Sequence, residues 1–371
     1  MQSLKTMAVG LLVLLAGWTS SLNAETAPGP LVFISAHGGI HVYRLDAKTG
    51  ALRHQSTATD ASASFLAVHP SGRWLYGAGG GVSAFSIAPQ TGTLSLLGHT
   101  KTGGNGECHI AVDPTGACVL TANYGDGSVA AVRLKPNGHL DKVTALAHHK
   151  GSSVNPQRQE GPHAHSINLD AEGAFAYAAD LGLDKVMIYR LDPTQGSLTP
   201  ASPPSAALKP GAGPRHLSFT PSGRYAYVIN ELDSTVTAFR HSKANGQLDE
   251  IQTITSLPEG FSGENYPSEV LVEPSGRFVY GANRGHDSIV VFSIAAETGK
   301  LTLVEHESTQ GKWPRNFGID PTGSYLIVGN QQSETVVVFR IDKDTGELHA
   351  SGEVARIQGA SCIRFLATNR A

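Results

Sequence analysis

Histidine, arginine and glutamate residues lie at two fixed distances from a glycine turn that recurs along this 371-residue chain. Eight positions before a turn glycine stand His165, Arg215 and Arg315, and eight positions after one stand Glu231 and Arg284. Arginines that crowd a cleft of low dielectric bind anions or stabilise a developing oxyanion. A carboxylate among them can act as a general base, and a histidine as a base or an acid. These residues predict a catalytic site that uses His165, Arg215, Glu231 and Arg284.

Neighbouring positions supply candidates for substrate binding. One register further along lie His109, His216, Glu269 and Asn316. His163 precedes His165 by two positions, so on an extended segment both side chains point the same way. The predicted substrate-binding set is His163, His109, Asp180, Glu269, Arg315 and Asn316.

Asp180 belongs to a series of polar residues seven positions after the turn glycine. The other members that carry an amide are Asn123, Asn230, Asn283 and Asn330. Asn and Asp often hydrogen-bond to the backbone of their own loop. A structural role in the loop is therefore the alternative for this position.

Two glycine turns repeat out of phase and predict the fold. A Pro-Ser/Thr-Gly turn, with Ala-Glu-Gly in one copy, recurs six times at spacings of 44 to 57 residues, and a Gly-x-Leu turn recurs seven times. Between the turns lie short runs rich in β-branched and aromatic residues, such as 225–229 and 235–239, which have the composition of strands. Four strands per repeat are typical of one propeller blade. We therefore predict an all-β, seven-bladed β-propeller with four antiparallel strands per blade.

The two ends of the repeat predict how the ring closes. The first unit starts at residues 31–35 without an innermost strand, and residues 361–366 form a spare strand at the other end. We expect this C-terminal strand to complete the first blade, which removes an open sheet edge. Within a blade, the innermost strand starts at the rim where its neighbour ends. The candidate residues should therefore gather at one mouth of the central channel.

Motifs for several other chemistries are missing from the sequence. Three cysteines without a C-x-x-C pair exclude a Cys-rich zinc or redox site. There is no Gly-x-Ser-x-Gly elbow and no phosphate-binding P-loop. The run Gly79-Gly80-Gly81 lacks the strand–helix context of a dinucleotide site and is predicted to be a loop.

Two pairs of histidines lie close together in the sequence, a pattern that can indicate metal ligands. His163-x-His165 could bind one together with Glu160 or Glu231, but a metal site needs more convergent ligands than the sequence supplies. We therefore expect neither a metal nor a cofactor. The pair His148-His149 is predicted to face solvent on the outer part of a blade.

Composition and the first residues bear on partners and location. Charged residues make up 16% of the chain, the formal net charge is −3, and no basic run stands out, so nucleic acid is not an expected partner.

Lys5, the apolar run 7–17 and Ala24 have the pattern of a cleavable signal peptide. We predict a signal peptide at 1–24 and a propeller domain at 25–371, periplasmic or secreted. No cysteine follows the apolar run and no other stretch is apolar enough to cross a membrane, so no membrane anchor is expected.

Four segments resemble the propeller lactonases named after 6-phosphogluconolactonase. They contain the motifs Pro-His-Ala-His, Gly-Pro-Arg-His, Asn-Glu-Leu and Asn-Arg-Gly, and the segments span 160–191, 213–239, 266–292 and 313–339. The same family includes a fungal 3-carboxymuconate lactonizing enzyme, in which a His, two Arg and a Glu at the channel mouth carry the chemistry. Matched motif by motif, the resemblance implies His165 (with His163 as the second choice), Arg215, Glu231 and Arg284.

The resemblance implies hydrolysis of a sugar lactone to the free acid. Family members of the pentose phosphate route work in the cytoplasm, whereas this chain carries a predicted export signal, which favours an unphosphorylated aldonolactone as the small-molecule substrate. Two alternatives remain open. One is a ligand-binding or scaffold propeller without turnover, because fold alone does not decide function. The other is a lactonizing isomerase that acts on a muconate-like diacid.

Overall fold

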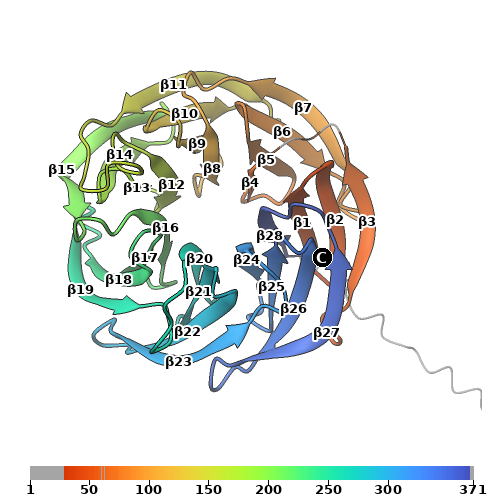
Figure 1. Cartoon of the computed structure of the whole chain (residues 1–371). Coiled ribbons are helices and arrows are strands. Elements are labelled where there is room, and N and C mark those ends of the chain that lie inside the picture. The colour runs from red at the N-terminus through yellow and green to blue at the C-terminus, as the bar shows by residue number, and fades with distance from the viewer. Residues whose placement is uncertain (1–28, 60, 62, 368–371) are drawn as a thin grey trace, which may run out of the picture.

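Seven four-stranded antiparallel sheets stand around a central channel (Figure 1). The computed structural model describes residues 29–59, 61 and 63–367, so the predicted signal peptide lies outside the described residues. Within this part of the chain, no helix is long and apolar enough to cross a membrane. The predicted all-β, seven-bladed propeller is confirmed.

Each blade contributes one strand to each of four concentric layers. The innermost strands, which line the channel, are β4 (Phe65–Val68), β8 (Glu107–Val112), β12 (Ala164–Leu169), β16 (Pro214–Phe219), β20 (Tyr266–Val272), β24 (Pro314–Ile319) and β28 (Cys362–Leu366). The second strands are β1 (Leu31–Ala36), β5 (Trp74–Ala78), β9 (Cys118–Asn123), β13 (Phe175–Asp180), β17 (Tyr225–Asn230), β21 (Phe278–Arg284) and β25 (Tyr325–Asn330).

The strands of the two outer layers are longer, and those of the outermost layer are also more exposed. The third strands are β2 (Gly39–Leu45), β6 (Val82–Ile87), β10 (Ser128–Leu134), β14 (Lys185–Asp192), β18 (Thr235–His241), β22 (Ser288–Ile294) and β26 (Thr335–Ile341). The outermost are β3 (Leu52–Ala58), β7 (Leu94–Thr100), β11 (Leu140–His148), β15 (Ser197–Ala207), β19 (Leu248–Thr255), β23 (Leu301–Ser308) and β27 (Leu348–Arg356).

The first blade is completed by the last strand. β28 pairs antiparallel with β1, with Ile363 opposite Ile34 and Cys362 opposite Ser35. Both isoleucines are buried in one hydrophobic cluster, so the junction between the two ends of the chain is part of the core. The predicted closure by the C-terminal strand is confirmed.

Contacts between blades explain why the Gly-x-Leu turn recurs. The buried Tyr227 on β17 donates its hydroxyl hydrogen bond to the carbonyl oxygen of Gly299, which lies in the next blade's turn, and Tyr177 bonds Gly246 in the same way. Gly246 has φ +77°, and a Cβ there would lie 2.6 Å from the ring of Phe175. Only glycine fits this backbone conformation and this close approach. The turn therefore locks each blade against its neighbour at the rim opposite the candidate site.

Candidate active site

A cavity of about 430 Å³ opens at one mouth of the channel. Its walls come from the starts of innermost strands and from the loops that follow second strands. The lining residues are Cys108, Tyr124, Arg158, His165, Glu231, Tyr266, Arg284, Trp313 and Arg315. A smaller cavity of about 150 Å³ adjoins it, because both are lined by Cys108, His165 and Arg315, and Arg215 lines the smaller one. The structure thus brings together all four predicted catalytic residues and the predicted Arg315.

Glu231 is the centre of the charged network. Its Oε2 lies 2.7 Å from Nη2 of Arg284 and 2.9 Å from Nε of Arg215, and its Oε1 accepts a hydrogen bond of 2.7 Å from Arg158. Burial alone would raise the pKa of Glu231, but Arg284 and Arg215 outweigh it and hold the pKa far below its usual range. Glu231 is therefore a permanent carboxylate that orients arginines, and it is a weak proton acceptor.

Arg215 stands at the start of β16, and its side chain lines the smaller cavity. Two residues hold its guanidinium group, Ser268 and Glu231. Nη1 donates to the carbonyl oxygen of Ser268, while Nε faces Glu231 as an ion pair without hydrogen-bond geometry. Burial, with Arg284 and Arg315 adding to it, lowers the pKa of Arg215 to about 9, so the group stays charged at neutral pH. The single carboxylate of Glu231 is thus contacted by three arginines, Arg158, Arg215 and Arg284. Arg315 also lines the cavity but has no hydrogen bond or ion pair to any described residue. The surplus of positive charge suits an oxyanion or an anionic product.

His165 lies near the same carboxylate oxygen that Arg215 and Arg284 contact, with Nε2 4.0 Å from Oε2 of Glu231. Burial, followed by repulsion from Arg215, lowers its pKa well below 6.5. The imidazole is therefore neutral at pH 7 and able to accept a proton. The nearby Cys108 donates its thiol hydrogen bond to the carbonyl oxygen of His165, and burial raises the thiol's pKa to about 12, so it is no thiolate nucleophile at neutral pH.

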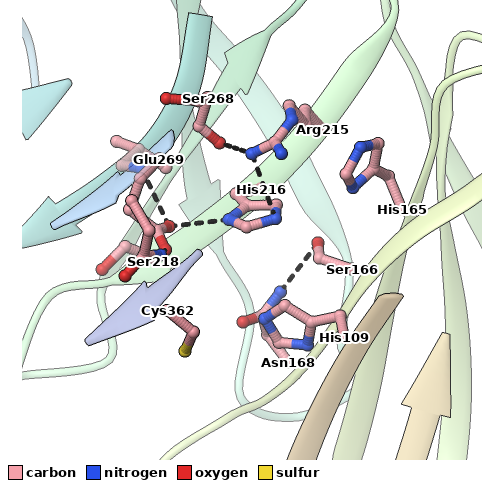
Figure 2. A network of polar contacts seen from close by, with 12 residues as sticks. His109, His165, Ser166, Asn168, Arg215, His216, Ser218, Ser268, Glu269 and Cys362 are labelled. Atoms are coloured by element: carbon pink, nitrogen blue, oxygen red, sulfur yellow. Dashed lines mark hydrogen bonds and ion pairs between the residues drawn. The ribbon is translucent and has the colours of Figure 1, made fainter. Parts of the chain in front are cut away.

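A second polar layer lies one residue further along the innermost strands than His165 and Arg215. Figure 2 shows its members His109, His216 and Glu269 beside Arg215 and His165. His216 stands between Arg215 and Glu269, and Glu269 also binds the amide of Asn316. His109 packs against the ring of Phe65 in a tilted arrangement, with ring centroids 4.1 Å apart and an angle of 33° between the ring planes. Of the predicted substrate-binding residues, His109, Glu269 and Asn316 therefore occupy this layer and do not line the 430 Å³ cavity.

His163 is placed at the edge of the site. Its ring stacks on Tyr124 with centroids 4.6 Å apart, and its nitrogens contact the carbonyl oxygen of Tyr124 and the carboxylate of Glu160. β12 begins only at Ala164, and a register shift follows it, so the simple alternation expected for His163 and His165 is interrupted. His163 does not line the cavity, although the ring it stacks on does.

Asp180 lies apart from the site and serves its own loop. One carboxylate oxygen accepts hydrogen bonds from the backbone N–H groups of His163, Gly182 and Leu183, and the other lies 2.5 Å from Nδ1 of His149. The expectation that His149 faces solvent is wrong, because this buried contact with Asp180 draws the ring inside. The loop role that was the alternative for Asp180 accounts for its bonds to Gly182 and Leu183, and the contacts with His163 and His149 tie this loop to two neighbouring segments.

Several cavity residues have no counterpart in the repeat pattern. Arg158 comes from the connection between β11 and β12, which lies within the longest spacing between turn glycines, 57 residues. Trp313 has a φ of +64°, a strained value for a bulky residue, and its backbone N–H donates to Asp287. Arg284 lies over its ring at 5.6 Å. The unusual length of one connection was the only signal in the sequence for Arg158.

Metal-ligand geometry is absent from the described part of the chain, where no group of three or more His, Cys, Asp or Glu side chains converges to hold an ion. All three cysteines are free thiols.

Comparison with known proteins agrees with the fold and with the resemblance noted in the sequence. A 6-phosphogluconolactonase of Bacillus subtilis is 38% identical over 285 residues, covering 75% of this chain and 80% of that protein, and one of Formosa agariphila is 33% identical with 75% and 81% covered. The solved structure of a periplasmic gluconolactonase of Pseudomonas aeruginosa superposes with a TM-score of 0.86 at 31% identity, covering 92% of this chain and 99% of that one. The family described as "Lactonase, 7-bladed beta-propeller" matches residues 29–365. This chain therefore belongs to the lactonase family of seven-bladed β-propellers.

Proposed function

We propose that this lactonase hydrolyses an unphosphorylated aldonolactone outside the cytoplasm. The observation that carries the proposal is the Glu231 carboxylate bound by Arg215 and Arg284, with a neutral His165 4.0 Å away, in a cavity large enough for a sugar ring. The predicted signal peptide at 1–24 supports export. The likeness to a periplasmic gluconolactonase supports a lactone without a phosphate group.

The reaction follows from the charges at the site. Water adds its oxygen to the lactone carbonyl carbon, and its proton passes to the neutral imidazole of His165. Negative charge develops on the carbonyl oxygen, where the guanidinium groups of Arg215 and Arg284 stabilise it. The bond from the carbonyl carbon to the ring oxygen then breaks. The ring oxygen takes the proton back from His165, and the product is the open-chain hydroxy acid. No step requires a cofactor.

Glu231 acts in this scheme through the arginines. Its pKa lies far below neutral pH, so it remains charged and fixes the two guanidinium groups at the positions where the oxyanion forms. Removing a single stabilising donor from such a site typically costs about 10²–10³ in rate. We expect a loss of that order for Arg215→Ala and for Glu231→Gln.

The test is a pH-stat assay of acid release from glucono-1,5-lactone and from its 6-phosphate. Glu172→Gln is a matched control, because Glu172 is exposed and lies in one of the turns at the opposite rim. The proposal expects acid release well above spontaneous hydrolysis for the unphosphorylated lactone, lost in Glu231→Gln and kept in Glu172→Gln. A clear preference for the 6-phosphate would overturn the choice of substrate. No acceleration of either lactone would overturn hydrolysis and leave the binding-module and lactonizing-isomerase alternatives.

A further inference from the structure

A second, larger cavity of about 610 Å³ lies at the same mouth of the channel, over the first, second and seventh blades. The smaller cavity beside the active site connects the two. It shares Cys108, His165 and Arg315 with the active-site cavity, and it shares Ser64, Gln331 and Ser361 with the large one. The active site therefore continues into a groove, defined here by the lining of the 610 Å³ cavity.

Glycines create the space in this groove. Gly80 occupies the loop position that Tyr124, Glu231 and Arg284 occupy in other blades, so the second blade contributes no side chain there. A Cβ on Gly80 or on Gly38 would meet no other atom within 4 Å. The glycine run 79–81, which no phosphate or dinucleotide site explains, thus has the effect of leaving one half of the channel mouth open.

The walls of the groove differ in charge from the active site. None of the described residues that line it is Asp, Glu, Lys or Arg. It offers backbone groups, hydroxyls such as those of Ser64 and Thr59, and the side-chain amide of the half-buried Gln331, which forms no hydrogen bond with any described residue. A surface of neutral donors and acceptors suits a neutral, hydroxylated group, and none of its described residues is the Lys or Arg that would favour a phosphate over such a group.

Resting on the proposed function, we infer that the substrate is an aldonolactone that carries a second sugar unit. The lactone ring would lie between Glu231 and His165, and the neutral glycosyl unit would extend past Arg315 into the groove beside Gln331. A lactone with a single ring fits within the 430 Å³ cavity and leaves the adjoining groove to water. The structure thus points to aldobionolactones, the lactones of oxidised disaccharides, as the substrate class.

The experiment compares kcat/KM for cellobiono-1,5-lactone and for glucono-1,5-lactone in the wild type, in Gln331→Trp and in Gln332→Trp. Trp at 331 fills the groove. Trp at 332 makes the same change at a neighbouring exposed position that does not line it. We expect the wild type to prefer the disaccharide lactone by about tenfold or more, which a few additional hydrogen bonds supply. This ratio should fall to about one in Gln331→Trp and persist in Gln332→Trp.

Two further measurements keep the outcome decisive. If Gln331→Trp fails to fold, Gly80→Asn narrows the same groove, because asparagine tolerates the φ of +66° found there. If neither lactone is hydrolysed, which would refute the proposed function alone, calorimetry compares the binding of cellobionate and gluconate. Tighter binding of cellobionate that is lost in Gln331→Trp supports the groove. Equal kcat/KM for both lactones in the wild type, or equal affinity for both acids, overturns it.

Discussion

His216 donates a hydrogen bond of 2.7 Å from Nδ1 to Oε1 of Glu269. The direction follows from the other ring nitrogen, because Nη1 of Arg215 lies 3.3 Å from Nε2 and a guanidinium can only donate. Burial, reinforced by Arg215, lowers the pKa of His216 well below 6.5, so the ring is neutral and Nδ1 carries its proton. Glu269 thereby fixes the tautomer of the His216 imidazole, whose Nε2 accepts a hydrogen bond from Arg215.

This relationship predicts that Glu269 positions Arg215 without touching the substrate. Glu269→Gln keeps an acceptor for His216 and should change kcat little. Glu269→Leu removes the acceptor, frees the ring to change tautomer, and should lower kcat by about tenfold to a hundredfold with a smaller effect on KM. Steady-state kinetics of the two variants check this. Equal losses in both would show that the charge of Glu269 matters, and not the fixed tautomer.

The pH dependence of the reaction should report His165. A general base works only when unprotonated, so activity is present above its pKa and is lost as the pH falls through it. Burial and Arg215 lower the pKa of His165 well below 6.5. We expect kcat/KM for the lactone to be level from pH 8 down through 6.5 and to fall only in more acidic solution. An inflection at or above 6.5 in the wild type would contradict this assignment.

The stability of the fold should also fall in acid. Burial lowers the pKa of His109, His165 and His216 well below 6.5 in the native state. Below pH 6.5 the unfolded chain binds protons at these histidines and the native chain does not, so the free energy of unfolding decreases as the pH falls. Each histidine contributes at most about 1.4 kcal/mol per pH unit.

Urea denaturation of the wild type and of His109→Gln between pH 5 and 8 measures this effect. Glutamine retains an acceptor for the N–H of Ile167. The variant should lose stability less steeply than the wild type below pH 6.5 and run parallel to it above pH 7. Parallel curves over the whole range would refute the role of His109.

Closure of the ring should make the last strand important for stability. Ile363 on β28 is buried beside Ile34 of β1, at the junction that joins the two ends of the chain. Ile363→Ala removes buried methyl groups and should cost about 2–5 kcal/mol in the free energy of unfolding. Leu303→Ala is the control, because Leu303 is 47% exposed on an outermost strand, and it should change stability by about 0.5 kcal/mol or less. Similar effects of both changes would refute a special role for the closure.

Because the sequence repeats, much of the candidate site could be predicted by comparing equivalent positions in different blades. The repeat places equivalent residues, eight positions before and eight positions after a turn glycine, at one mouth of the channel. Glu231 and Arg284 could therefore be recognised because the equivalent residues of other blades carry no charge. Asp180 lies one position before the equivalent of Glu231 and is also a candidate by sequence, but its side chain turns back to bind its own loop and His149, which local spacing does not determine. Arg158, Tyr266 and Trp313 come from connections between blades, or from the residues beside them, where lengths differ and no repeat exists for comparison.

The pairing of β28 with β1 has a consequence for the order of events in the cell. A ribosome makes residues 362–366 after all other strands, so the first blade lacks its innermost strand until nearly the whole chain has been synthesised. The ring cannot close on a partial product, and an incomplete chain keeps an open edge on β1. Delayed closure of this kind is compatible with passage through a membrane as an unfolded chain. The native channel mouth, with its arginines and its groove, would then form only after the last strand arrives.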